Sequence, residues 1–143
     1  MGTLVTNPAV DLFAQFATDE VREEAGFQTL IPNCGSVLFT VARTNNKGYL
    51  KLFQKLYKKV EPLIKAGGDV ADKKSEEIYI DVMAATILLG WEGSIAFKGE
   101  SLVYSKENAK KLLALKEFRA AVSRISEDVE NFKAVQEAEE EKN

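Results

Sequence analysis

The chain has 143 residues, of which 45% are hydrophobic and 29% charged, and its formal net charge is −3 at pH 7. This length predicts one domain, and this composition excludes a largely disordered or fibrous chain. The balance of 19 basic and 22 acidic side chains gives no overall attraction to nucleic acid or to an anionic membrane. We expect a single, mainly helical domain over residues 1–135 and an acidic, disordered tail over residues 136–143.

Several kinds of reactive side chain are absent or rare. The sequence has no histidine, and Cys34 is its one cysteine. Without an imidazole the chain lacks the usual general base near neutral pH and the commonest metal ligand of proteins. A single cysteine cannot form a disulfide within the chain, and the glycines form no phosphate-binding motif. We therefore expect a protein that is not an enzyme, has no cofactor or metal site, and has no apolar run long enough to span a membrane.

The first 43 residues predict a helical segment followed by a β-hairpin. Asn7-Pro8 has the pattern of a helix start, and apolar residues then recur at helical spacing as far as Gly26, although Thr18-Asp19 can divide the segment in two. Residues 27–31 and 36–43 are separated by a turn that contains Asn33 and Gly35. The second of these segments is rich in β-branched and aromatic residues, which favours an antiparallel pair of strands.

Two longer helices are predicted in the middle of the chain. From Asn46 an apolar stripe runs along one helical face, and Pro62 should bend or end that helix. The stripe is formed by Leu50, Phe53, Leu56, Val60 and Leu63. After a break at Gly67-Gly68, Asp72 or Ser75 can begin a second helix that extends to Trp91. This second helix is apolar on nearly every side, so we expect it at the buried centre of the domain.

The last third of the chain predicts a short connection and two further helices. The glycine-rich residues 90–104 favour a second β-hairpin within 94–104. Ser105 can cap a helix through Leu115, and a heptad seam predicts a final helix. The seam consists of Phe118, Val122, Ile125, Val129 and Phe132. The fold class predicted is therefore mainly α, a small helical bundle with a short β-hairpin or strand near residues 27–43 and a second near 94–104.

Charge and aromatic content point to four candidate partner-binding residues: Lys51, Lys55, Lys58 and Trp91. Residues 1–42 have a net charge of −4, from five acids and one base, whereas residues 43–74 have a net charge of +6, from nine bases and three acids. The three lysines lie one helical turn apart. This spacing predicts a basic surface that faces either solvent or a partner. Trp91 is either a hydrophobic plug between helices or a rigid aromatic anchor in an interface.

Residues 36–132 resemble the tail assembly chaperones of long-tailed bacteriophages. The resemblance depends on short motifs in a fixed order, each of them degenerate. They are Phe39-Thr40-Val41-Ala42-Arg43 before Asn45-Asn46 and Tyr49, then Gly90-Trp91-Glu92-Gly93, then Tyr104-Ser105 with Ala109 and Leu112-Leu113, and finally Ser126-Glu127-Asp128 running to Asn131-Phe132. The sequence differs from the family at Leu115-Lys116-Glu117, where the family often has a proline, so we expect the last two helices to run on or to kink.

The resemblance implies a protein that binds the tape measure protein in the host cell cytoplasm and is not retained in the mature virion. Such chaperones keep the tape measure protein soluble until tail tube subunits polymerise, so the tail tube protein is a second expected partner. Family members often have a longer form that is made by a ribosomal frameshift near the end of the short reading frame. Residues 141–143 can be encoded by GAA-AAA-AAC, a run of A on which such a frameshift can occur. The uneven charge also suggests a weak homo-oligomer. The alternatives are a head–tail connector or neck adaptor of the virion and a helical DNA-binding regulator, although we expect no nucleic-acid or membrane partner.

Overall fold

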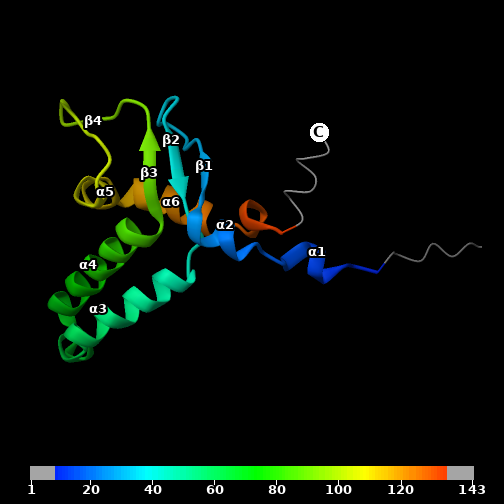
Figure 1. Cartoon of the computed structure of the whole chain (residues 1–143). Coiled ribbons are helices and arrows are strands. Elements are labelled where there is room, and N and C mark those ends of the chain that lie inside the picture. The colour runs from blue at the N-terminus through cyan, green and yellow to red at the C-terminus, as the bar shows by residue number, and fades with distance from the viewer. Residues whose placement is uncertain (1–8, 135–143) are drawn as a thin grey trace, which may run out of the picture.

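The computed structural model describes residues 9–134, and the part described is mainly helical with two small antiparallel sheets (Figure 1). Helices make up 59% of it, which confirms the predicted fold class. The elements in chain order are α1 (Leu12–Phe16), α2 (Glu20–Ala25), β1 (Phe27–Thr29), β2 (Leu38–Val41), α3 (Lys47–Ala66), α4 (Gly68–Thr86), β3 (Leu88–Glu92), β4 (Ala96–Phe97), β5 (Glu100–Ser101), α5 (Lys106–Leu113), α6 (Lys116–Glu127) and the short 3-10 helix η1 (Val129–Phe132). The expected helix start at Asn7-Pro8 and the acidic tail lie outside the described residues.

The larger sheet has the strand order β1-β2-β3, with both pairs antiparallel. The predicted hairpin over residues 27–43 is confirmed as the β1–β2 pair. The predicted helix through Trp91 is wrong at both ends, because α4 begins at Gly68 and ends at Thr86, and Leu88–Glu92 forms β3. A short apolar run is compatible with a buried helix or a buried strand, and the unpaired edge of β2 decides for the strand by offering hydrogen bonds to Leu88–Glu92. The second predicted hairpin is confirmed as the β4–β5 pair.

α3 and α4 form an antiparallel hairpin that extends away from the sheet (Figure 1). Asn46 caps α3, and Gly67, at φ 75°, ends it as the sequence predicted. α3 nevertheless continues past Pro62 to Ala66. Pro62 and Lys58 are both exposed, so water can hydrogen-bond the Lys58 carbonyl that loses its donor to the proline.

α5 and α6 are separate helices, although no proline divides them. Ser105 caps α5 by accepting a hydrogen bond from the Asn108 amide at 3.0 Å, as predicted. The chain becomes extended at Leu115, and Arg119 Nη1 donates to the Leu113 carbonyl at 2.8 Å, which satisfies a helix end that would otherwise lack a partner. The heptad seam was expected within one helix. α6 instead ends at Glu127, and the last seam residue, Phe132, lies fully buried in η1.

Residues 11–25 form two short helices, divided at Thr18-Asp19 as the sequence allowed. Asp11 and Asp19 accept capping hydrogen bonds at the two helix starts. The chain between the helices is fixed to η1, because the Asp19 amide donates to the Phe132 carbonyl at 2.9 Å and the Ala134 amide donates to the Ala17 carbonyl at 3.0 Å. α1 itself projects away from the rest of the molecule (Figure 1).

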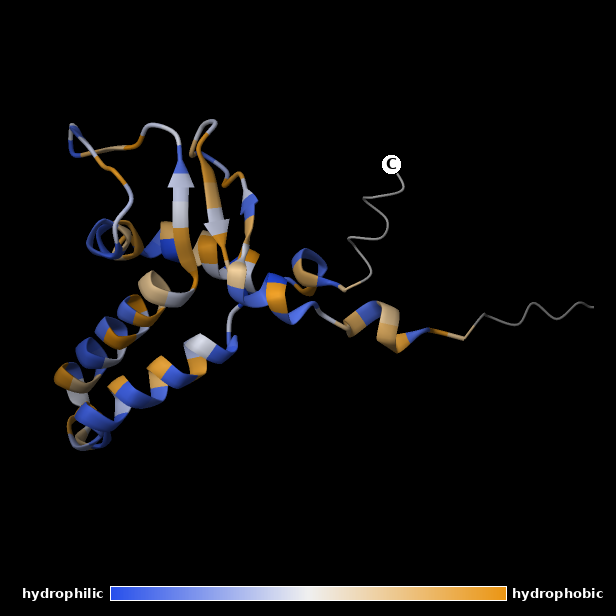
Figure 2. Ribbon diagram, viewed as in Figure 1, coloured by the Kyte–Doolittle hydropathy of each residue, from blue (hydrophilic) through white to orange (hydrophobic). Residues whose placement is uncertain are grey.

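The core lies between the three-stranded sheet and helices α4, α5 and α6. Its innermost side chains are apolar and less than 2% exposed: Phe39, Val41, Val82, Met83, Leu88, Leu113 and Val122. Hydropathy colouring shows apolar residues along the inner sides of the α3–α4 hairpin and the sheet, and also along α1, which no other element covers (Figure 2). Within residues 9–134 there is no helix with the length and apolar content needed to cross a membrane.

Candidate partner-binding surface

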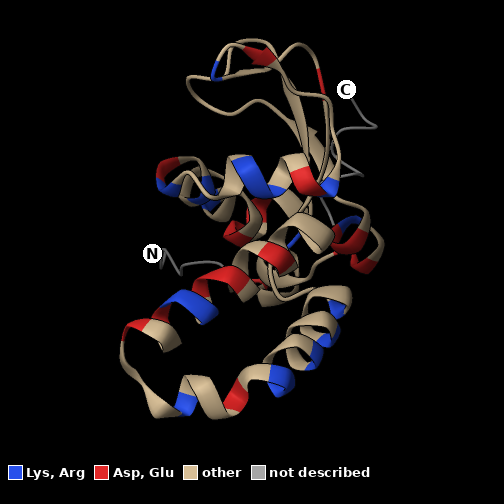
Figure 3. Ribbon diagram, turned by 90° about the vertical axis from the view of Figure 1, so that its left-hand side faces the viewer, with Lys and Arg blue, Asp and Glu red and all other residues tan. Residues whose placement is uncertain are grey.

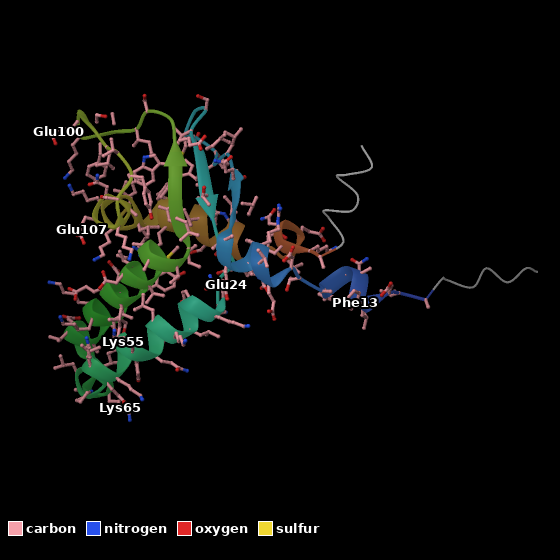
Figure 4. The ribbon with its side chains drawn as sticks, in the orientation of Figure 1. Phe13, Glu24, Lys55, Lys65, Glu100 and Glu107 are labelled. Carbon is pink, nitrogen blue, oxygen red and sulfur yellow. The ribbon has the colours of Figure 1, made fainter. Side chains whose placement is uncertain are left out.

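The basic face of α3 is the surface of the hairpin opposite to the side that packs on α4. It consists of Lys47, Lys51, Lys55, Lys58, Lys59 and Lys65, all of them exposed. Figure 3 shows basic residues following one helix of the hairpin, and Figure 4 labels Lys55 and Lys65 on α3. The structure thus places the three lysines singled out from sequence on one continuous surface.

The side of α3 that packs on α4 differs in part from the predicted stripe. Phe53, Leu56 and Val60 are half-buried against the core as predicted. Leu50 and Leu63 were expected in the stripe, but they remain 48% and 47% exposed. Leu52 and Ile64 take their places against the core. The way one helix packs against another selects the buried arc, and sequence periodicity cannot fix that arc to within one residue.

Among the residues that the structure describes, most of the basic face has no ionic partner. Lys47 contacts Glu20 at 3.5 Å, and Lys65 contacts Glu61 at 2.7 Å. The hydrogen bond from Glu61 raises the pKa of Lys65 above its ordinary value. In the part of the chain that the structure describes, no carboxylate lies within 4.0 Å of Lys51, Lys55 or Lys58. These three charges are therefore available to an acidic partner.

Exposed apolar side chains border the lysines. Leu50 and Leu63 lie near the two ends of α3, and Val70, which is 60% exposed, follows at the start of α4. Lysine stems add further apolar area while their ammonium groups stay in water. An open hollow is lined by Leu50, Lys51 and Gln54 of α3 and by Glu24 of α2. A surface of this kind suits a helix that carries both acidic and apolar side chains.

Trp91 is 9% exposed and lies in β3, not at the end of a helix. Its indole Nε1 donates to the Leu102 carbonyl at 3.3 Å. The ring contacts Tyr104 edge-to-face with centroids 5.0 Å apart and Phe39 at 6.3 Å. These contacts agree with the first of the two predictions for Trp91, a hydrophobic side chain that fills space in the core, and not with an exposed interface anchor. A partner can reach the indole only after this packing has opened.

An N-terminal arm of exposed apolar side chains was missed by the sequence analysis. We define it as residues 9–16, and its large side chains Val10, Leu12, Phe13 and Phe16 are 63–72% exposed. Figure 4 shows Phe13 on α1, pointing away from the molecule. Apolar residues at helical spacing were found here from the sequence, with no prediction of what covers them. Periodicity shows which residues share a face but not what covers that face.

A partly open apolar groove lies between the β1–β2 turn, β4 and the α5–α6 junction. It has a volume of about 350 Å³, and its lining includes Cys34, Val37, Ile95, Phe97, Leu115 and Phe118. Burial raises the pKa of the Cys34 thiol, so the thiol stays protonated at neutral pH and is a weak nucleophile. Within residues 9–134 no three acidic or cysteine side chains are grouped closely enough to hold a metal ion.

These observations define a small, mainly helical protein whose distinctive exposed features, within residues 9–134, are the basic face of α3 and the apolar N-terminal arm. The family model described as YdaY prophage protein matches residues 44–143. The chain therefore belongs to the YdaY prophage protein family. The match covers α3 through η1 and continues into the C-terminal residues, whereas the N-terminal arm, α2, β1 and β2 precede it. No curated protein and no solved structure matches the chain.

Proposed function

We propose that this prophage protein is a non-enzymatic tail assembly chaperone that binds the tape measure protein in the host cytoplasm. The short motifs within residues 36–132 that resemble such chaperones support the proposal. The match of residues 44–143 to a prophage protein family agrees with a phage origin and does not itself name a role. Both comparisons include α3, the helix with the basic face.

The observation that carries the proposal is the unpartnered basic face of α3. α3 has 20 residues, so the face is about 30 Å long at 1.5 Å per residue. A surface of that length can lie along a helical partner for several turns. Lys51, Lys55 and Lys58 supply positive charge for acidic side chains of the partner, and Leu50 and Leu63 cover apolar ones. A long helical protein that exposes apolar surface aggregates unless such a surface covers it.

The strength of a single contact suits transient binding. Exposed ion pairs contribute about 0.2–1 kcal/mol each, so three lysines and two half-exposed leucines give weak binding per copy. Many copies along one tape measure protein raise the total affinity, because each further contact forms at a high effective concentration. Weak individual contacts also let tail tube subunits displace the chaperone one copy at a time.

The proposal is tested by co-expressing the tape measure protein of the same prophage with and without this protein and measuring its soluble fraction. The wild type should increase that fraction, and the triple variant Lys51→Glu, Lys55→Glu, Lys58→Glu should abolish most of the increase. A matched triple variant, Lys98→Glu, Lys106→Glu, Lys111→Glu, makes the same change in net charge at exposed positions outside α3 and should behave as the wild type. Equal loss with both triple variants would refute a role for the basic face.

The composition of purified virions separates a chaperone from a head–tail connector or neck adaptor. A chaperone should be detectable in lysates of induced cells and absent from purified particles by quantitative mass spectrometry. A stoichiometric amount in the particles would establish a virion component and overturn the proposal. A gel shift of double-stranded DNA that depends on salt and is lost in the Lys51, Lys55, Lys58 variant would instead support the DNA-binding alternative.

A further inference from the structure

We propose that the N-terminal arm of one copy docks in the apolar groove of a second copy. The arm and the groove are two apolar surfaces of one chain, and no residue in the range 9–134 covers either of them. Phe16 lies four residues after Leu12 and three after Phe13, so the three side chains share one side of α1. Their exposed fractions are 63%, 72% and 65%, unusually high for large apolar side chains that are neighbours in space.

The groove offers a complementary site. At about 350 Å³ it is near the lower limit of about 300–1,000 Å³ for ligand pockets, which gives room for one or two aromatic side chains. Phe97, Phe118 and Leu115 supply most of the apolar wall. A second hollow of about 320 Å³ adjoins the groove and shares Asn33, Cys34 and Phe118 with it. The two hollows together give side-by-side positions for two side chains one helical turn apart.

The arm is directed away from the groove of its own chain. Ala17 and Asp19 are hydrogen-bonded to Ala134 and Phe132, which fixes the base of the arm on η1. In Figure 1, α1 projects from one side of the molecule and β4 lies on the opposite side. In this arrangement the exposed arm faces solvent, where it meets the groove of a second copy more readily than its own.

Charge permits this contact, and area predicts its strength. The arm carries Asp11, and the hollow that adjoins the groove is lined by one acid and one base, Glu117 and Arg124, so a docked arm meets no net repulsion there. Burying two phenylalanines and a leucine removes at most roughly 600 Å² of arm surface from water, since each aromatic side chain buries about 150–250 Å². That area corresponds to the weak, reversible class of interfaces.

Arm and groove are different surfaces, so each copy can donate an arm and accept another. Such a head-to-tail contact extends into open chains unless its rotation closes a ring. Assembly should therefore continue beyond a dimer as concentration rises. The contact is apolar, so salt should not dissolve it, in contrast to a charge-driven homo-oligomer.

The test is light scattering coupled to size exclusion on the full-length protein alone, over a wide concentration range. The weight-average mass of the wild type should rise from 15.8 kDa to more than twice that value. The arm variant Phe13→Ser, Phe16→Ser and the groove variant Leu115→Glu should each stay monomeric at every concentration. Val103→Ser removes an apolar side chain that is 72% exposed but belongs to neither surface, and it should assemble as the wild type does.

Mixing the two deficient variants gives the sharper result. The arm variant keeps an intact groove and the groove variant keeps an intact arm, so the mixture should form a one-to-one dimer and nothing larger. Circular dichroism and melting temperature establish that each variant is folded, and Ala96→Glu replaces Leu115→Glu if the latter is not. A monomeric wild type, assembly of the arm variant, or a mixture without dimer would each overturn the proposal. The assay contains no tape measure protein, so its outcome is independent of the proposed function.

Discussion

Asn46 shows how much structure a single side chain can hold together. Its amide oxygen accepts a hydrogen bond from the Tyr49 amide at 2.9 Å and so caps α3. Its amide nitrogen donates to the carbonyls of Arg43 at 2.8 Å and Thr86 at 3.2 Å. The side chain, only 6% exposed, thereby joins the end of the loop after β2, the start of α3 and the end of α4.

We predict that Asn46→Ala lowers the free energy of unfolding by about 2–4 kcal/mol, since it removes a cap and the side-chain donor of two partly buried hydrogen bonds, to the Arg43 and Thr86 carbonyls. The matched control is Ser105→Ala, which removes only the capping bond of α5 and should cost about 1 kcal/mol. Urea unfolding measures both. Equal losses in the two variants would mean that the bonds to Arg43 and Thr86 contribute nothing.

Trp91 is the second residue whose environment gives a definite expectation. Trp91→Ala empties a site enclosed by Phe39 and Tyr104 and should lower the free energy of unfolding by about 3–5 kcal/mol. Trp91→Phe keeps a ring but loses the bond to the Leu102 carbonyl, and should cost about 1–2 kcal/mol. An unchanged melting temperature in Trp91→Ala would show that the indole is not part of the core, and would restore it as a candidate interface anchor.

At the scale of elements, the turn between α2 and β1 decides whether the hairpin can form. Gly26 has φ 78°, and a Cβ atom there would lie 2.8 Å from the carbonyl oxygen of Val41 in β2. The glycine therefore does two things: it adopts a left-handed conformation, and it lets β2 approach closely.

We expect Gly26→Ala to lower the free energy of unfolding by about 3 kcal/mol, the combined cost of a left-handed alanine and a displaced strand. Gly99→Ala is the matched control, because Gly99 has φ 84° but open space around its Cβ position, and it should cost about 1 kcal/mol. Thermal unfolding of both variants separates the two terms. A smaller effect at Gly26 than at Gly99 would contradict the role assigned to the close approach of β2.

At the scale of the whole molecule, Phe132 connects the two ends of the described chain. It is completely buried, and its ring contacts Phe27 edge-to-face with centroids 5.3 Å apart. The guanidinium of Arg43 lies 5.5 Å from the centroid of the same ring. Arg22 Nε also donates to the Asn131 carbonyl at 2.6 Å. η1 thus holds α2 against the sheet and fixes the base of the N-terminal arm.

We predict that Phe132→Ala speeds amide hydrogen exchange in residues 17–25 well before it affects α4, and that it lowers the free energy of unfolding by about 3–5 kcal/mol. Phe13→Ala, which truncates an aromatic ring that is 72% exposed, should leave exchange in α2 and the melting temperature of the monomer unchanged. Uniform acceleration across the chain in Phe132→Ala would instead indicate that η1 and the core unfold as one unit.

The sequence alone was sufficient wherever structure depends on neighbouring residues. The cap at Ser105, the helix ends at Gly26 and Gly67, both β-hairpins and the exposure of Lys51, Lys55 and Lys58 follow from local chemistry, because a cap or turn needs partners only a few residues away. The mainly helical fold follows from hydrophobic periodicity for the same reason.

Only the tertiary structure decided the features that depend on distant partners. Leu88–Glu92 is a strand because β2 offers it hydrogen bonds, and Phe132 leaves the predicted helix because η1 packs on α2 and β1. The apolar faces of α1 and α3 look alike in sequence, yet α4 covers one and no described residue covers the other. Burial is a property of what lies opposite a surface, and a sequence pattern specifies only the surface itself.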